Sequence, residues 1–82
     1  MARNVQVGAD EIDLVMSWGP LLVAIEVKTR VGGDPADQFT AEKARRFRRA
    51  GRGLRPPPGR YDLVAVRLGR AGAEVRWLPG AG

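Results

Sequence analysis

The sequence predicts one α/β domain built on a mixed β-sheet: an antiparallel three-strand meander, a crossover helix, a parallel fourth strand and a short edge strand. Two observations predict this class. Polar and apolar residues alternate in several short runs, which is the period of a β-strand. Roughly thirty residues with helix-forming character separate the third run from the fourth, as in a right-handed parallel crossover. With 82 residues, the chain has room for a single domain over residues 1–82.

The expected elements, in chain order, are strands over residues 3–7, 11–17 and 21–29, a loop over 31–35, a helix over 41–50, and strands over 61–68 and 73–78. In the first strand Val5 and Val7 face one side. A Trp18-Gly19-Pro20 break predicts a tight turn between the second and third strands. The high apolar content of the third strand indicates burial on both faces at the sheet centre. The last strand is closed by Pro79.

The helix has start and stop signals at both ends. Thr40 fits an N-cap, and Ala44 and Phe47 give the helix a narrow apolar stripe. Gly51 and Gly53 are expected to end it, and the prolines that follow prevent its return.

Composition excludes several kinds of chemistry. The chain has no cysteine and no histidine, which removes disulfides, thiolate zinc sites and histidine bases. Any reaction must use carboxylates, lysine, hydroxyls or a metal held by oxygen. The longest apolar runs fall short of the ~18 residues that span a bilayer, and the start does not resemble a signal peptide. We therefore expect a cytoplasmic protein.

Charge is divided unevenly along the chain. Residues 1–42 carry three basic and seven acidic side chains, whereas residues 43–82 carry eleven basic and two acidic ones. This asymmetry favours a polyanionic partner for the second half, with the acidic residues of the first half kept for another purpose.

Charged residues interrupt the apolar runs of the central hairpin. If its turn is centred on Gly19 and Pro20, antiparallel partners have residue numbers that sum to 39. Asp13 then lies opposite Glu26, and Glu11 lies opposite Lys28. Period-two alternation puts these four side chains on one face.

The opposed pair of carboxylates implies a cation. Directly opposed residues have Cβ atoms about 5 Å apart, and like charges in that position destabilise a sheet. Mg²⁺ (or Mn²⁺) is the natural candidate between Asp13 and Glu26, because these ions prefer carboxylate oxygens and retain waters that can be activated. Lys28 would then orient or deprotonate a water, or neutralise charge on a phosphate. Two structural alternatives stay open: Glu11 and Lys28 form an ordinary ion pair, and Asp13 caps its strand.

The spacing also resembles a known family. An aspartate, a spacer of twelve and Glu-x-Lys, here Asp13, Glu26 and Lys28, is the signature of the PD-(D/E)XK nuclease superfamily. The surrounding residues resemble the YraN-like family of endonuclease-related proteins, which is similar to Holliday-junction resolvases. The residues that carry the resemblance are Ala2-Arg3-Asn4-Val5, Glu11-Ile12-Asp13-Leu14-Val15, Glu26-Val27-Lys28-Thr29-Arg30, Thr40 with Lys43 and Arg46, and Tyr61-Asp62-Leu63-Val64-Ala65-Val66.

The resemblance implies a restriction-endonuclease-like fold and a metal-dependent endonuclease that hydrolyses phosphodiester bonds in duplex or branched DNA. It implies that Asp13 and Glu26 hold the metal with the carbonyl of Val27, and that Lys28 assists the attacking water. Thr29 and Arg30 would lie near the scissile phosphate.

One departure from the family pattern is visible. Members carry an N-terminal helix with a further acidic residue, and here the sequence begins at Met1-Ala2-Arg3-Asn4. Three interpretations follow: the start is internal to a longer reading frame, the protein is a reduced and inactive member, or a partner chain, as in a homodimer, covers the exposed sheet face. The alternative function is therefore a nuclease-like module that binds nucleic acid or a protein without cutting.

The segment from residue 43 to residue 60 is strongly basic. It holds eight basic residues and no acidic one, whereas a solvated helix face normally mixes both signs. We expect it to bind the phosphate backbone of DNA by shape and charge. The residues expected to do so are Lys43, Arg45, Arg46 and Arg49.

Overall fold

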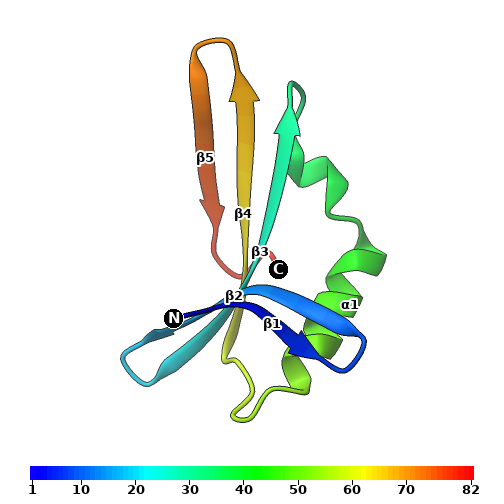
Figure 1. Ribbon diagram of the computed structural model, residues 1–82, viewed down its shortest axis with the longest axis vertical. Coiled ribbons are helices and arrows are strands. Elements are labelled where there is room, and N and C mark those ends of the chain that lie inside the picture. Colours follow the sequence, from blue (N-terminus) through cyan, green and yellow to red (C-terminus); the bar gives the residue numbers. More distant parts are fainter.

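The computed structural model describes residues 1–82 and forms one mixed five-stranded sheet with a helix on one face (Figure 1). The strands lie in chain order: β1 (Ala2–Val7), β2 (Asp10–Trp18), β3 (Leu21–Val31), β4 (Arg60–Gly69) and β5 (Gly72–Leu78). Only β3 and β4 are parallel, and the crossover between them contains the 3-10 turn η1 (Pro35–Gln38) and the helix α1 (Ala41–Arg52). The predicted α/β mixed sheet is confirmed, and η1 is an element that composition did not predict.

Helix α1 begins where the sequence predicts and ends later. The Thr40 hydroxyl accepts a hydrogen bond from the Lys43 N–H at 3.3 Å, which confirms the N-cap. Of the two glycines expected to end the helix, Gly53 is confirmed as the C-cap, whereas Gly51 lies within the helix, which continues to Arg52. Gly51 has a packing role instead. A Cβ atom there would lie 2.4 Å from the Tyr61 ring, so only glycine allows this close approach. No helix is long and apolar enough to cross a membrane.

The core lies between α1 and the sheet. Phe47 and Ala50 of the helix pack on Ile12 and Ala24 of the central strands, and all four are buried. Phe47 also meets Tyr61 edge to face, with ring centroids 5.5 Å apart. This contact fixes the distance at which α1 stands above the sheet.

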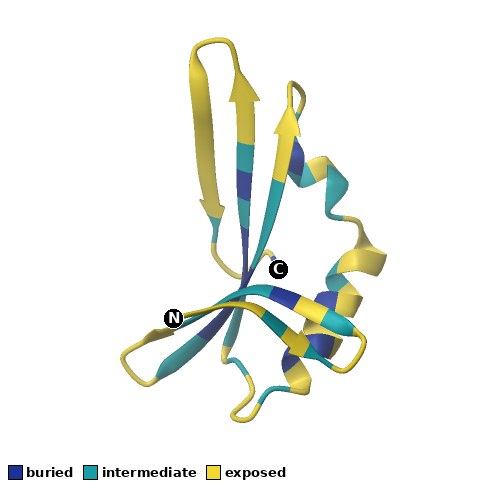
Figure 2. Ribbon diagram, in the orientation of Figure 1, coloured by how far each residue is buried: buried dark blue, intermediate teal, exposed yellow.

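The other sheet face carries no element (Figure 2). The expected burial of the third strand on both faces holds at its centre, where Val23, Ala24 and Ile25 are buried. Towards the sheet edges the open face is exposed. There Trp18 and Trp77, which are 64% and 45% exposed, pack on each other with ring centroids 6.0 Å apart.

Strand β2 bends at Asp13. The regular pairing of β2 with β3 stops at Leu14 and Ile25, and on the other side the pairing with β1 omits Asn4, whose φ is 53°. Strict alternation would place Ile12 and Val15 on opposite faces, yet both pack in the core beneath α1. The bend therefore turns the first half of β2 toward the helix, as the course of β1 and β2 in Figure 1 shows.

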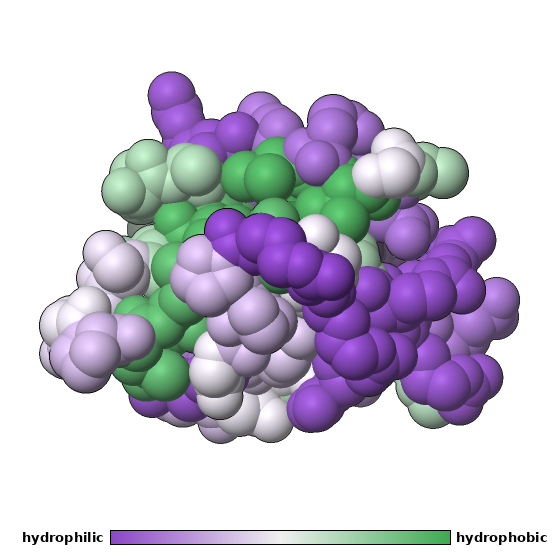
Figure 3. All heavy atoms as spheres, turned by 90° about the horizontal axis from the view of Figure 1, so that it is seen from below, coloured by the Kyte–Doolittle hydropathy of each residue, from purple (hydrophilic) through white to green (hydrophobic).

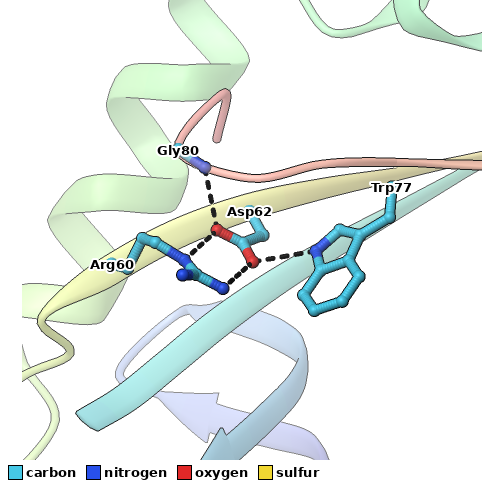
Figure 4. Close-up of polar contacts among 4 residues, drawn as sticks. All are labelled: Arg60, Asp62, Trp77 and Gly80. Carbon is cyan, nitrogen blue, oxygen red and sulfur yellow. Dashed lines mark hydrogen bonds and ion pairs between the residues drawn. The ribbon is translucent and has the colours of Figure 1, made fainter. Parts of the chain in front are cut away.

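A buried carboxylate fastens the C-terminal end of the chain to β4 (Figure 4). Asp62 is fully buried and accepts two hydrogen bonds from the Arg60 guanidinium, one from Trp77 Nε1 and one from the Gly80 N–H, all at 2.8 to 2.9 Å. Burial opposes ionisation, but Arg60, Gly80 and Trp77 together hold the pKa of Asp62 below its usual value. Every acceptor position of this carboxylate is used within the fold.

We expect Asp62→Asn to destabilise the fold by about 3 kcal/mol, because the amide removes the charge that Arg60 faces and places a donor where acceptors are needed. Urea denaturation followed by circular dichroism measures the change. Glu74→Gln is the matched control, since Glu74 forms an exposed pair with Arg67 and should change stability by less than about 1 kcal/mol. Equal effects of the two substitutions would contradict this account.

Candidate active site

A cavity of about 190 Å³ lies between α1 and the sheet. The sheet contributes carboxylates and a lysine, and the helix contributes basic side chains and the edge of the core. Its lining residues are Asp10, Glu11, Glu26, Lys28, Lys43, Arg46, Phe47 and Ala50. Acidic and basic groups therefore face one another across the cavity.

Asp13 and Glu26 lie close together, as the sequence predicts, although the regular β2–β3 pairing ends one residue pair earlier, at Leu14 and Ile25. Asp13 Oδ2 accepts a hydrogen bond from the Val27 N–H at 2.8 Å, and the two carboxyl groups share a hydrogen bond. Burial, this bond and the charge of Asp13 raise the pKa of Glu26 to about 8, against the opposing effect of Lys28. Glu26 consequently carries a proton at neutral pH, and this proton lets the two groups lie side by side.

The predicted pairing of Glu11 with Lys28 was wrong. The β2–β3 ladder ends before these residues because of the bend at Asp13, and the Glu11 carboxylate accepts a hydrogen bond from Gln6 Nε2 at 2.8 Å on β1. Lys28 forms no ion pair with any carboxylate. Both side chains nevertheless line the cavity with Glu26, so Lys28 offers an uncommitted ammonium group there.

The predicted DNA-contacting residues fall into two groups on α1. Lys43 and Arg46 line the cavity. Arg45 and Arg49 lie on the exposed outer face, where Arg49 pairs with Asp10 at 3.7 Å. Figure 3 shows a strongly hydrophilic surface on the side of the molecule where α1 lies in Figure 1.

Thr29 and Arg30 are not brought to this cavity. Both are exposed near the end of β3, and neither is among its lining residues. Alternation also turns Thr29 to the sheet face opposite to Lys28. The guanidinium of Arg30 folds back over Gly33.

The donor set suits a hard cation only in part. Asp13 and Glu26 supply two carboxylates, and oxygen donors are what Mg²⁺ takes. No group of three or more acidic, histidine or cysteine side chains is close enough to hold a metal. A cation here would therefore rely on backbone oxygen and water for its remaining ligands.

Sequence reasoning missed Asp10 and Asp62. Asp10 lines the cavity and forms an ion pair with Arg49. It lies at the start of a strand, where polar residues are common, so the sequence pattern does not single it out. Asp62 is flanked by apolar residues within a strand, which is the same signal that singles out Asp13 and Glu26. Its saturated hydrogen bonds give it a structural role.

Comparisons with known proteins place the sequence among close relatives. The model of a family described as "Uncharacterised protein family UPF0102" matches residues 1–66. A UPF0102 protein of Symbiobacterium thermophilum is 44% identical over 88% of this chain and 69% of its own length. One from Bordetella petrii is 41% identical over 99% of this chain and 56% of its own length. One from Streptomyces coelicolor is 43% identical over 92% of this chain and 66% of its own length.

The chain thus spans a little over half to about two thirds of the length of these relatives. No solved structure matches it.

The raised pKa of Glu26 predicts that the fold loses stability as pH rises from about 5 to about 8. Over this range the folded protein keeps a proton on Glu26 that the unfolded chain releases, so deprotonation favours unfolding. Because Glu26 is only partly buried, solvent screening limits the loss to about 1 to 2 kcal/mol. Glu26→Gln should flatten this part of the stability curve, measured by urea denaturation at several pH values. Glu74→Gln should retain the wild-type slope, and identical slopes in all three proteins would refute the assignment.

Proposed function

The chain belongs to family UPF0102, and we propose that it is a metal-dependent endonuclease of restriction-endonuclease-like fold that hydrolyses phosphodiester bonds in duplex or branched DNA. The observation that carries the proposal is the adjacent pair of carboxylates, Asp13 and Glu26, of which Glu26 lines the cavity under a basic helix together with Lys28, while Asp13 lies beside Glu26 outside the lining. A fold has no structural need for two carboxyl groups that must share a proton to coexist. A cofactor that replaces the proton explains the arrangement.

In this proposal Asp13 and Glu26 hold Mg²⁺ (or Mn²⁺), and the carbonyl of Val27 completes the protein ligands. When bound, the ion polarises a phosphoryl oxygen and lowers the pKa of water. The Asp13 carboxylate is already fixed by the Val27 N–H, and the hydrogen bond that it shares with Glu26 is given up when Glu26 loses its proton. Glu26 must give up its proton to become a ligand, so metal affinity should rise with pH.

Lys28 is the residue that acts on the attacking water. Its ammonium group lines the same cavity as Glu26 and forms no ion pair. It is therefore free to orient the water or to neutralise charge that develops on the phosphate. Glu11 has a supporting role beside Lys28, since it lines the cavity and its position is set by Gln6.

The helix supplies phosphate binding. Lys43 and Arg46 line the cavity that also contains Glu26 and Lys28, so we assign to them the contact with the reacting phosphate, in place of Thr29 and Arg30. The outer arginines, including Arg45 and Arg49, would hold phosphates further along the duplex. Guanidinium contacts of this kind are independent of base sequence.

A second function is a module that binds DNA without cutting it. The small number of possible metal ligands favours this function, because only two carboxylates lie together and no group of three acidic, histidine or cysteine side chains is close enough to hold an ion. The same basic helix would then act alone. The two functions differ in one measurable respect, which is cleavage above a metal-free control.

We expect Asp13→Asn to reduce Mg²⁺-dependent cleavage of duplex, flap or junction DNA by about 100-fold or more. Asparagine still accepts the Val27 hydrogen bond through its amide oxygen, so the fold should persist while a charged ligand is lost. Asp37→Asn, at an exposed position of η1, is the matched control and should cleave normally. Undiminished cleavage by Asp13→Asn would overturn the nuclease proposal, whereas wild-type DNA binding without any cleavage would favour the binding module.

Arg45→Ala should weaken DNA binding about five-fold at physiological salt and lower the salt dependence by about one counterion, without a change in sequence preference. Fluorescence anisotropy with a labelled duplex at several salt concentrations measures both effects. Arg70→Ala removes an equally exposed charge from the β4–β5 turn and should have little effect. If the two substitutions weaken binding equally, the helix is not the DNA-binding surface.

A further inference from the structure

Strand β5 is an open edge of the sheet. It is hydrogen-bonded only to β4, and nothing lies on its outer side (Figure 1). Residues 72–77 are all exposed (Figure 2). Soluble proteins protect such edges with proline, charged side chains or a bulge. Strand β5 has no proline, its pairing with β4 is regular from Gly69 and Gly72 to Leu63 and Leu78, and its two charged side chains, Glu74 and Arg76, have opposite signs.

The backbone groups that β5 leaves unpaired can be identified from its register. The Leu68 carbonyl accepts a hydrogen bond from the Gly32 N–H at 3.2 Å, on the β3 side of β4. The backbone N–H and C=O groups of Leu68 therefore point away from β5. The same groups of its partner Ala73 point away from β4. Alternation gives Val75 and Trp77 the same direction. These three residues point their N–H and C=O groups outward at the edge.

We propose that β5 pairs with β5 of a second copy of this chain, antiparallel and centred on Val75, so that two sheets join into one. In this register Val75 lies opposite the partner's Val75, and Ala73 lies opposite the partner's Trp77. Each of these pairs consists of residues with outward N–H and C=O groups, so each can exchange both hydrogen bonds of an antiparallel ladder. The interface is isologous and closes as a dimer.

Charge complementarity favours a second copy as the occupant. In the same register Glu74 lies directly opposite the partner's Arg76, and the two-fold axis repeats this pair. Such pairs alternate with the hydrogen-bonded ones, so their side chains come close. Within each chain Glu74 already binds Arg67 at 2.8 Å, and Arg76 binds Asp34. Pairing would join these bridges into a ladder in which acidic and basic groups alternate.

The apolar face of β5 gives the same register a second contribution. Val75 and Trp77 are 62% and 45% exposed and lie on the open face. Pairing brings the two Val75 side chains together across the axis and places Trp77 beside the partner's Ala73. An unrelated extended peptide would satisfy the backbone but would not reproduce these matched side chains.

Sedimentation velocity of the full chain, from about 1 µM to about 300 µM, tests the proposal, since one added strand pair gives an interface of the weak, small class. We expect a reversible monomer–dimer equilibrium. Val75→Pro should remain monomeric, because its lost N–H serves the edge and not the β4 pairing. Val75→Thr, which keeps the N–H and the branched side chain, should dimerise. A wild-type protein that stays monomeric at the highest concentration would overturn the proposal.

Charge exchange provides a test that does not depend on proline. Glu74→Arg and Arg76→Glu should each be monomeric, because each places like charges opposite one another. An equimolar mixture of the two should form a heterodimer, since opposite charges then meet in both pairs. Mixing does not restore the one intrachain bridge that each substitution removes, Arg67–Glu74 in the first variant and Asp34–Arg76 in the second. Circular dichroism and thermal unfolding confirm that each variant is folded. A dimer that forms equally well with either variant alone would rule out this register.

Discussion

The hydrogen bond from the Val27 N–H to the Asp13 carboxylate sets the geometry on which the rest of the structure depends. In a regular continuation of the hairpin this N–H would bond to the carbonyl of Ile12, because the register sums to 39. The Asp13 side chain takes that position instead. Strand β2 then leaves β3, Ile12 joins the core under α1, and space opens between the sheet and the helix. The same side chain thus ends the strand pairing and begins the site.

Two buried or half-buried carboxylate environments in this chain have opposite chemistry. Asp62 accepts four hydrogen bonds and its pKa is lowered. It is therefore an ionised carboxylate with no acceptor position left for a ligand. Glu26 has another carboxyl as its hydrogen-bond partner and has its pKa raised. A protein gains nothing in stability from the second arrangement. The contrast separates a carboxylate that serves the fold from a pair that is available to an external cation.

Much of the fold could be predicted from sequence, because alternation, turn residues and the Thr40 cap are local signals. The adjacency of Asp13 and Glu26 was also predictable, since a two-residue turn fixes which residues of a hairpin are near one another. The bend at Asp13 was not, because the competition between a side-chain and a backbone acceptor has no periodic signature. For the same reason the Glu11–Lys28 pairing failed. The helix end was predicted too early because Gly51 is a glycine for another reason, which is the close approach of the Tyr61 ring. Tyr61 lies outside the helix, so the local sequence gives no sign of this contact.

The parallel pairing of β3 with β4 also determines how the chain can fold. The strands β1 to β3 are joined by short turns, so their contacts close small loops at little entropic cost. Pairing β4 with β3 instead requires the whole crossover, from Gly32 to Gly59, to be brought into a closed loop. Contacts of this separation slow folding. The N-terminal meander therefore has the lowest closure cost, the crossover and β4 close the core over it, and two of the residues that bind Asp62, Trp77 and Gly80, follow β4 in the chain.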